Sequence, residues 1–383
     1  MADRLRVLIA GVSVRAFAES AARAGYAVTA VDGFGDLDLE QVAHRVITMP
    51  GRFSAGRAAR AATGSACDAT AYASGFENHP RAVAKLLALG PLWGNSPEVL
   101  ARVRDPLRLA RALVARGLPA PRVRVARAPL AVGTRWLLKP RASGGGHGIT
   151  LWRPTPRGRR HLPWAMYLQE RIPGFAGSIV FAADGERSVP LGLSRALWGE
   201  RCFGAAGFRY SGSILAAPGD LPLAPAAALA AALTEEFGLV GVNGIDFIAR
   251  ASGVYAIEVN PRYTASMELV EHAYGISIFD AHVRACAGKL PTFDLAAALE
   301  LRQPVYGKAI VYARRTTTIP DSRDWLTAGD VRDIPRPGEV IERGRPVCTV
   351  FAQGPSHARC LVALTNRAAA LYEAIEAPTR RIA

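Results

Sequence analysis

The sequence predicts a mixed fold of the α/β and α+β classes, with a parallel sheet near the N-terminus and antiparallel hairpins later in the chain. The first observation is an apolar strand at Leu5–Ala10, followed by a glycine turn, a helix to about Arg23 and a second strand at Tyr26–Val31. This β-α-β order is typical of a parallel sheet. The second observation is the pair of apolar segments Val242–Arg250 and Val254–Val259, which a short glycine-containing turn joins into a hairpin.

The N-terminal unit continues with further alternating elements. We expect a strand at Ala69–Ser74 and a helix at Arg81–Leu89. Proline and glycine then mark a boundary near residue 95, and a second helix follows from Pro106 to Arg116. We therefore expect a Rossmann-like first domain over residues 1–95.

The turn after the first strand raises the possibility of a dinucleotide cofactor. Asp32 follows Gly11 at the distance where dinucleotide folds keep a ribose-binding acid. The full G-x-G-x-x-G fingerprint is absent, however, because Ser13 and Ala16 occupy the second and third glycine positions. An NAD(P)-dependent oxidoreductase built on this unit remains an alternative.

A glycine-rich loop follows the apolar strand that contains Lys139. Four glycines within five residues carry a large entropic cost, so the backbone is needed close to another group. Exposed N–H groups of such a loop cradle phosphate oxygens, and Lys139 would add a point charge. The candidate loop residues are Ser143, Gly144, Gly145, Gly146 and Gly148. A flexible hairpin tip with a solvated lysine is the simpler interpretation.

Two more segments are candidates for ligand contact. The strand that ends at Gln169-Glu170-Arg171-Ile172 is compatible with adenine binding through its backbone groups, although the residues do not require it. The polar loop with Arg209 and Tyr210 could face a substrate. Loops around residues 11–15, 74–79 and 203–213 would set specificity.

The hairpin at residues 242–262 predicts a metal site. If Arg250 pairs with Val254, Asp246 lies directly across from Glu258, and Asn260 shares their face. Opposed carboxylates repel and persist most readily around a cation. Carboxylate and amide oxygens suit Mg²⁺ or Mn²⁺, and Arg262 adds a planar anion-binding fork. The simpler interpretation is an edge hairpin with a solvated face.

Helices and a β-rich segment complete the chain. We expect helices at Leu223–Phe237, Met267–Ala273 and Ile278–Ala287. A C-terminal segment over residues 301–383 is richer in β-type residues, with strands at Lys308–Tyr312 and Val347–Ala352. It ends in a helix over residues 358–377, although a strand over residues 360–364 is an alternative for its first half.

Length and composition exclude several classes of protein. The 383 residues predict two or three domains, and a hydrophobic content of 50% excludes a mainly disordered chain. No run of about 18 uncharged apolar residues occurs, and the start lacks a signal-peptide pattern, so we expect a soluble cytoplasmic protein with no membrane partner. The five cysteines show no C-x-x-C spacing, which favours neither a disulfide framework nor a thiolate zinc site.

The net charge of +15 comes almost entirely from arginine, because the chain has only four lysines. This bias reflects either genome composition or the binding of anions, whether nucleotide, polycarboxylate or nucleic acid. The arginines are spread along the chain rather than gathered in one basic arm, so we expect no nucleic-acid partner. A non-catalytic anion or nucleic-acid binder remains the second alternative.

The order of these motifs over residues 1–300 resembles the ATP-grasp superfamily. The sequence Glu258-Val259-Asn260-Pro261-Arg262 carries the most specific part of the likeness. The C-terminal phrase DIPRPGEVIERGRPVCTVFA is similar to the closing segment of the biotin-carboxylase-like branch. Within that branch the chain resembles carboxylate–amine ligases associated with one-carbon cofactors. The resemblance implies an ATP-grasp domain at 96–300, with a lid subdomain at about 130–170.

The resemblance also implies a role for each matching residue. Lys139 would contact ATP phosphates, residues 143–148 would close over them, and residues 170–172 would lie at the adenine hinge. Asp246, Glu258 and Asn260 would hold Mg²⁺ (or Mn²⁺), and Arg262 would contact the γ-phosphate or a bound carboxylate. Family members usually carry a lysine directly after the aspartate at position 105, where this chain has Pro106, and Arg108 is the candidate replacement.

The implied chemistry is ATP-dependent amide formation through an acylphosphate, with Lys139 and Arg262 as the catalytic cations. A small-molecule carboxylate and an amine would be the substrates, and an amino acid such as glutamate is a plausible one. Neither substrate follows from the sequence. A homodimer is a common outcome for a chain of this size.

Overall fold

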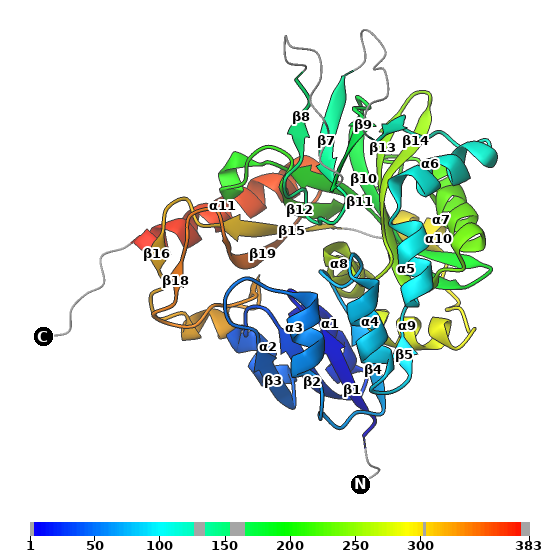
Figure 1. Ribbon diagram of the computed structural model, residues 1–383. Helices are drawn as coiled ribbons and strands as arrows, with labels where there is room; N and C mark the ends of the chain where they lie inside the picture. Colours follow the sequence, from blue (N-terminus) through cyan, green and yellow to red (C-terminus); the bar gives the residue numbers. More distant parts are fainter. Residues whose placement is uncertain (1–3, 126–134, 154–164, 302–303, 377–383) are drawn as a thin grey trace, which may run out of the picture.

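The computed structural model describes residues 4–125, 135–153, 165–301 and 304–376. The N-terminal part is a parallel sheet with the strand order β3-β2-β1-β4-β5 and lies at the bottom of Figure 1. Its strands are β1 (Arg6–Ala10), β2 (Ala27–Asp32), β3 (Arg45–Thr48), β4 (Ala69–Tyr72) and β5 (Leu92–Trp93). Its helices are α1 (Arg15–Arg23), α2 (Leu37–Val42), α3 (Ala55–Ala61) and α4 (Pro80–Leu87).

Two helices lead from this unit into a small antiparallel sheet. They are α5 (Pro97–Val103) and α6 (Pro106–Ala115). Each begins with proline after a capping side chain, Ser96 for α5 and Asp105 for α6, a typical helix start. The small sheet has the order β6-β9-β7-β8, with β6 (Val123–Arg124), β7 (Trp136–Pro140), β8 (Thr150–Leu151) and β9 (Met166–Glu170).

An eight-stranded antiparallel sheet forms the centre of the molecule, in the order β14-β13-β10-β11-β12-β15-β19-β17. Its strands are β10 (Phe175–Asp184), β11 (Ser188–Trp198), β12 (Tyr210–Leu215), β13 (Val240–Arg250), β14 (Gly253–Asn260), β15 (Val305–Tyr312), β17 (Val331–Arg332) and β19 (Pro346–Gly354). The C-terminal strands therefore continue the central sheet, because β15 pairs with β12.

The remaining elements surround this sheet. They are α7 (Leu223–Phe237), α8 (Ala265–Tyr274), α9 (Ile278–Cys286), α10 (Leu295–Leu301), α11 (His357–Glu376), the 3₁₀ turns η1 (Arg201–Phe203) and η2 (Arg323–Thr327), and a small ribbon of β16 (Thr317–Thr318) and β18 (Val340–Ile341). Figure 1 shows α8 between the N-terminal sheet and the central sheet.

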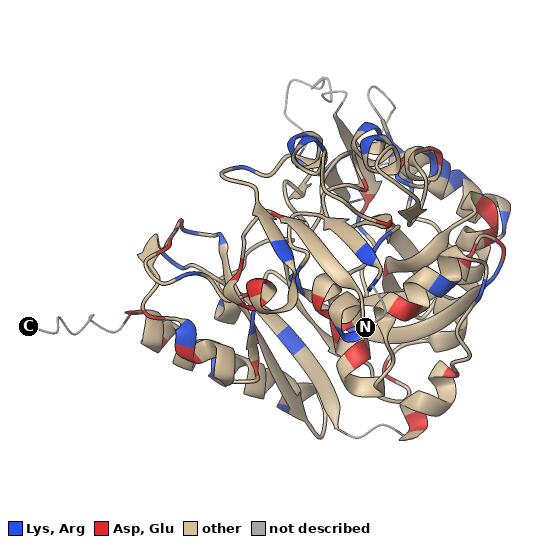
Figure 2. Cartoon of the chain, turned by 90° about the horizontal axis from the view of Figure 1, so that it is seen from below, with Lys and Arg blue, Asp and Glu red and all other residues tan. Residues whose placement is uncertain are grey.

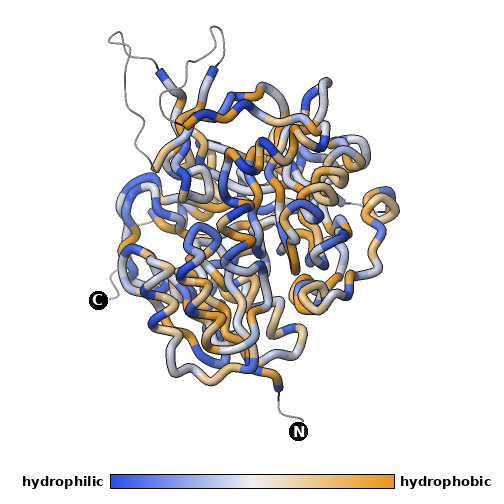
Figure 3. The backbone as a smooth tube through the Cα atoms, turned by 45° about the vertical axis from the view of Figure 1, so that its right-hand side comes forward, coloured by the Kyte–Doolittle hydropathy of each residue, from blue (hydrophilic) through white to orange (hydrophobic). Residues whose placement is uncertain are grey.

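The alternation of side chains along β10 explains these layers. Ile179 and Phe181 pack in one apolar cluster with the α7 residue Leu229. Val180 and Ala182 point to the opposite face, where their cluster includes α8, α9 and the N-terminal helix α1. Because alternate residues of a strand face opposite sides, β10 is buried on both faces. Figure 3 shows hydrophobic residues, in orange, alternating with hydrophilic ones, in blue, along the backbone tube.

The structure confirms the predicted fold class and most of the predicted elements. Helix α7 has the predicted bounds, and α11 shows that the strand alternative for residues 360–364 is wrong. Residues 130–134 and 154–164 of the expected lid lie outside the described residues. Among the described helices, none is long and apolar enough to span a bilayer. The domain boundaries stay predictions.

Candidate active site

A cavity of about 1080 Å³ lies between the N-terminal sheet, the small sheet and the central sheet. Its wall contains nearly every residue that the sequence singled out: Lys139, Ser143, Gly144, Gly145, Gly146, Gln169, Glu170, Arg171, Ile172, Arg209, Tyr210, Asp246, Glu258, Asn260 and Arg262. Gly148 is not part of this wall. Residues far apart in sequence thus meet around one volume large enough for a nucleotide and a second substrate.

The hairpin of β13 and β14 places the acidic residues opposite each other. Asp246 pairs with Glu258, as predicted, but the assumed turn is wrong, because Arg250 pairs with Gly253 rather than with Val254. A bulge between Asp246 and Phe247 shifts the register by one residue and restores the Asp246–Glu258 pair. Bulges of this kind re-aim side chains next to functional sites.

The environment of Asp246 favours a cation. Burial, with the charge of Glu258 as the second cause, raises the pKa of Asp246 to about 6. Its Oδ2 accepts a hydrogen bond of 3.0 Å from Nδ2 of Asn260. A divalent ion between the two carboxylates would remove the repulsion that raises this pKa.

These oxygens fit a hard divalent ion. Two carboxylates and the amide oxygen of Asn260 are the kind of donors that Mg²⁺ prefers, and Mg²⁺ usually completes its shell with water and phosphate oxygens. Among the described residues, no group of three or more His, Cys, Asp or Glu side chains is placed to hold a metal ion. The candidate site therefore depends on the amide and on a ligand phosphate as well as on the two carboxylates.

Arg262 is held in place by a buried partner that the sequence analysis did not identify. Its Nε and Nη2 both donate to Oε1 of Glu77, at 3.0 and 2.9 Å. The two side chains are 9% and 1% exposed. Burial would raise the pKa of Glu77, but the charges of Arg262 and Arg104 outweigh it and lower that pKa. The guanidinium is thus fixed beside Asn260, to whose Oδ1 Nη2 also donates at 3.2 Å.

In the contacts that the structure describes, the Lys139 ammonium meets neutral groups: two oxygens and the ring of Tyr167, whose centroid is 5.9 Å away. Lys139 is 5% exposed, and Nζ donates to Oε1 of Gln169 at 3.1 Å and to the carbonyl of Ile257 at 3.4 Å. A buried ammonium held only by neutral acceptors retains its attraction for an anion. Gln169, expected at the adenine hinge, therefore also positions the lysine.

The glycine loop docks onto the segment that contains Arg209 and Tyr210. The N–H of Tyr210 donates to the carbonyl of Gly145 at 3.0 Å. At Gly146, where φ is +75°, an added Cβ would lie 1.7 Å from the carbonyl oxygen of Phe208. Only glycine fits this close approach, so the loop sequence is needed for packing as well as for any phosphate contact.

Glu170 is bound to a neighbouring strand at the expected hinge. Its Oε2 accepts from Nε of Arg122 at 3.0 Å, and its N–H donates to the carbonyl of Arg122 at 2.8 Å. The Arg122 hydrogen bond keeps the pKa of the Glu170 carboxyl below its usual value. The side chain is thus engaged in the small sheet, and its adenine-contacting role remains a proposal.

Arg104, rather than Arg108, bridges the parts of the site. Arg108 lies on α6, is exposed and does not line the cavity, so the replacement of the family lysine by Arg108 stays a prediction without support from this geometry. Arg104 donates to Glu258 at 2.8 Å, to the carbonyl of Ser143 at 3.0 Å and to Oδ1 of Asn78 at 3.0 Å. Arg104 thus joins the β13–β14 hairpin, the glycine loop and the N-terminal unit.

The Asp32 carboxylate accepts hydrogen bonds from nearby backbone N–H groups. It is fully buried, and its oxygens accept the N–H groups of Val14, Phe34 and Gly35 at 2.7–2.8 Å. Burial raises its pKa to about 6 in spite of these bonds. A carboxylate occupied in this way is not presented to a ribose, which counts against the dinucleotide alternative.

Comparisons with known proteins show similarity to ATP-grasp proteins in the part of the chain that contains most of these residues. The model of the ATP-grasp domain matches residues 103–266. A segment of 120 residues is 32% identical to the uncharacterised protein MJ0776 of Methanocaldococcus jannaschii, and it covers 31% of this chain but only 28% of that protein.

Solved structures match nearly the whole chain. N5-carboxyaminoimidazole ribonucleotide synthetase from Thermus thermophilus has a TM-score of 0.66 at 20% identity, over 98% of this chain and 99% of that one. Pyruvate carboxylase of Rhizobium etli has a TM-score of 0.70 at 16% identity, over 95% of this chain and 37% of that one.

A third match was solved with a nucleotide. The biotin carboxylase domain of 2-oxoglutarate carboxylase from Hydrogenobacter thermophilus, in complex with MgADP and bicarbonate, has a TM-score of 0.66 at 16% identity, over 91% of this chain and 86% of that one. These comparisons confirm the expected ATP-grasp likeness at the level of domain and fold: residues 103–266 match the ATP-grasp domain model, and the chain shares its fold with biotin carboxylases and N5-carboxyaminoimidazole ribonucleotide synthetases.

Proposed function

We propose that the protein is an ATP-dependent carboxylate–amine ligase that forms an amide and releases ADP and phosphate. The observation that carries this proposal is the convergence of Lys139, the glycine loop, the Asp246–Glu258 pair and Arg262 on one cavity. The lysine, the arginine and the loop N–H groups would bind phosphate directly, and the carboxylate pair would do so through a divalent ion. Phosphoryl transfer depends mainly on such positioning and charge stabilisation.

The first step activates the carboxylate, which is a poor acyl donor because oxide would have to leave. A carboxylate oxygen forms a bond to the γ-phosphorus of ATP, the bond from that phosphorus to the β,γ-bridging oxygen breaks, and ADP leaves. The product is an acylphosphate. Lys139 and Arg262 would offset the charge that develops on the transferred group. A Mg²⁺ ion held by Asp246, Glu258 and Asn260 would neutralise phosphate charge.

In the second step the amine nitrogen attacks the acyl carbon. The bond from that carbon to the phosphate oxygen breaks, and the departing phosphate takes up the proton that the nitrogen loses. Water would hydrolyse the acylphosphate, so the site must be covered. Residues Ser143–Gly148 would act as that cover, and Gln169–Ile172 would hold the adenine.

The substrates belong to the same proposal. We propose an amino acid, with glutamate as the first candidate, and a role in the biosynthesis of a one-carbon cofactor, on the strength of the sequence resemblance. Specificity would come from the loops around residues 11–15, 74–79 and 203–213, and Arg209 and Tyr210 are the candidate substrate contacts. A homodimer in the cytoplasm is the expected setting.

The test is ADP release measured against a matrix of amino acids and amines. Wild type should release ADP with one carboxylate–amine pair, and Asp246→Asn and Lys139→Ala should lower kcat/KM by about 100-fold or more, since each removes a charge that acts on the transferred phosphate. The exposed residues Asp324 and Lys289 provide matched controls, and Asp324→Asn and Lys289→Ala should leave the rate unchanged.

Equal ADP release from wild type and the two site variants would remove the assignment. Salt-sensitive binding of a polyanion without nucleotide turnover would instead favour the binding-protein alternative. Figure 2 shows basic and acidic residues interspersed over the chain, which supports the small-molecule reading.

A further inference from the structure

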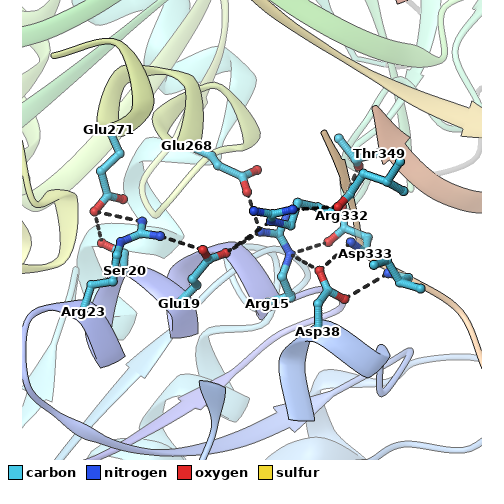
Figure 4. A network of polar contacts seen from close by, with 12 residues as sticks. Arg15, Glu19, Ser20, Arg23, Asp38, Glu268, Glu271, Arg332, Asp333 and Thr349 are labelled. Carbon is cyan, nitrogen blue, oxygen red and sulfur yellow. Dashed lines mark hydrogen bonds and ion pairs between the residues drawn. The ribbon is translucent and has the colours of Figure 1, made fainter. Parts of the chain in front are cut away.

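Two of the cationic side chains on the cavity wall are neutralised within the protein. Arg15 and Lys308 are buried, and both form ion pairs with Glu268. Arg15 also pairs with Glu19 at 2.9 Å and with Asp333 at 3.0 Å. Figure 4 shows Arg15 between α1, α8 and the C-terminal segment, with these carboxylates around it. Neither cation is therefore available to an anion of a ligand.

Three other arginines on the same wall have no such partner. Arg209, Arg343 and Arg345 all line the cavity, and none of them forms an ion pair with an acidic side chain among the described residues. Arg209 directly precedes β12, and the other two lie in the turn between β18 and β19. We call these three residues the basic wall.

Backbone hydrogen bonds fix the turn that carries two of these arginines. The N–H of Gly344 donates to the carbonyl of Ala313 at 2.7 Å, and the N–H of Ala313 donates to the carbonyl of Arg345 at 2.9 Å. The N–H of Arg345 also donates to the carbonyl of Glu342 at 3.0 Å. A fixed backbone lowers the entropic cost of ordering these side chains around a ligand.

Arg209 is held against the same turn. Its Nη1 donates to the carbonyl of Gly344, and its guanidinium carbon lies 5.0 Å from the ring centroid of Tyr312. Its Nε and Nη2 have no hydrogen-bond partner in the described part of the chain, and neighbouring atoms do not close them off. The guanidinium is therefore positioned by one nitrogen and keeps two others for a ligand.

The basic wall lies close to both the glycine loop and the β13–β14 hairpin. Partial burial and then the charges of Arg209 and Arg345 lower the pKa of His147 in the glycine loop. Burial, with a smaller contribution from the charge of Asp246, raises the pKa of the Tyr210 hydroxyl. A cleft lined by charges of one sign concentrates ions of the opposite sign. The wall can thus attract an anion near the place of phosphoryl transfer.

The proposed phosphate chemistry gives the basic wall no role. Lys139, Arg262 and a divalent ion on the β13–β14 hairpin account for the charge of the nucleotide in that reaction. Arginine binds carboxylate and phosphate groups through paired hydrogen bonds. A second group of cations on the same cavity therefore indicates a second anion, which the substrate carries.

We propose that the basic wall binds an anionic group of the carboxylate substrate, separate from the carboxylate that reacts. This group is a carboxylate or a phosphate, since the guanidinium suits both. The inference rests on the proposed ligase function and deepens it, because it makes the substrate at least a dianion. With one anionic group on Arg209 and Arg345, the reacting carboxylate extends toward Arg262 and the γ-phosphate.

The test is calorimetric titration of the full chain, with MgADP in the nucleotide site and again without nucleotide. One series of probes carries two carboxylates (succinate and glutarate), and a second carries a carboxylate and a phosphonate (phosphonoacetate and phosphonopropionate). Acetate, propionate, butyrate and valerate are the matched monocarboxylates. At least one dianion should bind wild type about tenfold more tightly than its monocarboxylate, and the tighter series identifies the anionic group.

Variants of Arg345 locate that binding. Arg345→Met removes the charge of an exposed side chain while the backbone still holds the turn, so the fold should persist. It should weaken dianion binding by about tenfold, the typical effect of losing one charge-assisted hydrogen bond, and should leave MgADP binding unchanged. Arg345→Lys should retain part of the affinity. Arg60→Met, on α3 and outside the cavity, is the matched control and should have no effect.

The outcomes separate this inference from the proposed function. Absence of MgADP binding would contradict the ligase assignment, whereas dianion binding that Arg345→Met weakens would still support the anion site. In wild type alone, equal binding of the dianions and their monocarboxylates would overturn the basic wall as a substrate site. Equal dianion binding by wild type and Arg345→Met would also overturn it. Tenfold weaker MgADP binding by Arg345→Met would do the same, because the wall would then hold nucleotide phosphates.

Discussion

At the scale of single residues, Asp246 is a buried carboxyl of the candidate site whose ionisation affects the stability of the fold. The bulge in β13 sets it across from Glu258, and burial raises its pKa to about 6. A carboxyl with a raised pKa is easier to bury protonated than ionised. The folded protein therefore holds this proton more tightly than the unfolded chain does.

This difference predicts a pH dependence of stability in the absence of Mg²⁺. Because the pKa of Asp246 is higher in the folded state, its contribution to stability is greatest below about pH 4 and is lost as the pH rises through about 6. Asp246→Asn removes the ionisation. At pH 8 the variant should be more stable than wild type, by at most about 3 kcal/mol, and the difference should shrink toward pH 4.

Urea unfolding at several pH values measures this difference. The exposed variant Asp324→Asn serves as the control and should show no such trend. A stability difference between Asp246→Asn and wild type that stays constant from pH 4 to pH 8 would contradict the raised pKa.

The residues that sequence analysis missed act through partners that are distant in the chain. Glu77 is 185 positions from Arg262, and Arg104 is 154 positions from Glu258. Glu77 lies within the loop expected to set specificity, but nothing in its neighbourhood indicates its pairing with Arg262. The family pattern of a lysine directly after Asp105 indicated Arg108, although it is Arg104, one residue before Asp105, that contacts Glu258 and Ser143.

At the scale of elements, the glycine loop packs closely against residues 208–210. Gly146 approaches the carbonyl of Phe208 so closely that any side chain would collide with it. Gly145 also has positive φ, but a Cβ there would meet its nearest atom, from His147, at 3.8 Å. The two glycines therefore separate the effect of a collision from the effect of backbone strain.

Gly146→Ala should displace the loop, whereas Gly145→Ala should add only the strain of an alanine with positive φ, about 1 kcal/mol. We expect kcat/KM for ATP to fall by at least about tenfold more in Gly146→Ala than in Gly145→Ala, because positioning of the phosphates depends on the loop. Steady-state ADP release measures both variants. Equal losses would show that the packing onto Phe208 does not matter.

Elements with a strong local pattern were predictable from the sequence, whereas short ones were not. Helix α7 was predicted to the residue because its apolar face is long and Gly238 ends it in the left-handed conformation. Strands β3 and β5 were not predicted, since four and two residues carry too little periodicity. The hairpin register was predicted correctly at Asp246 from an incorrect turn, because the sequence does not show the bulge.

At the scale of the whole molecule, the cavity exists because four regions of the chain close around it. The N-terminal unit, the small sheet, the central sheet and the C-terminal segment all contribute to its wall. The sequence indicated the first three but treated the last as a separate β-rich part. Its strands join the central sheet through β12 and β15, a pairing between distant segments that local patterns do not encode.

The central claim is that the β13–β14 hairpin holds a divalent ion beneath the phosphates of a nucleotide. The most direct test is Mn²⁺ binding followed by electron paramagnetic resonance in the presence of ATP. Wild type and the exposed control Glu186→Gln should bind Mn²⁺·ATP alike, whereas Glu258→Gln and Asp246→Asn should each weaken that binding by about tenfold or more, since each removes a charged oxygen ligand. Equal affinity in all four proteins would contradict the account.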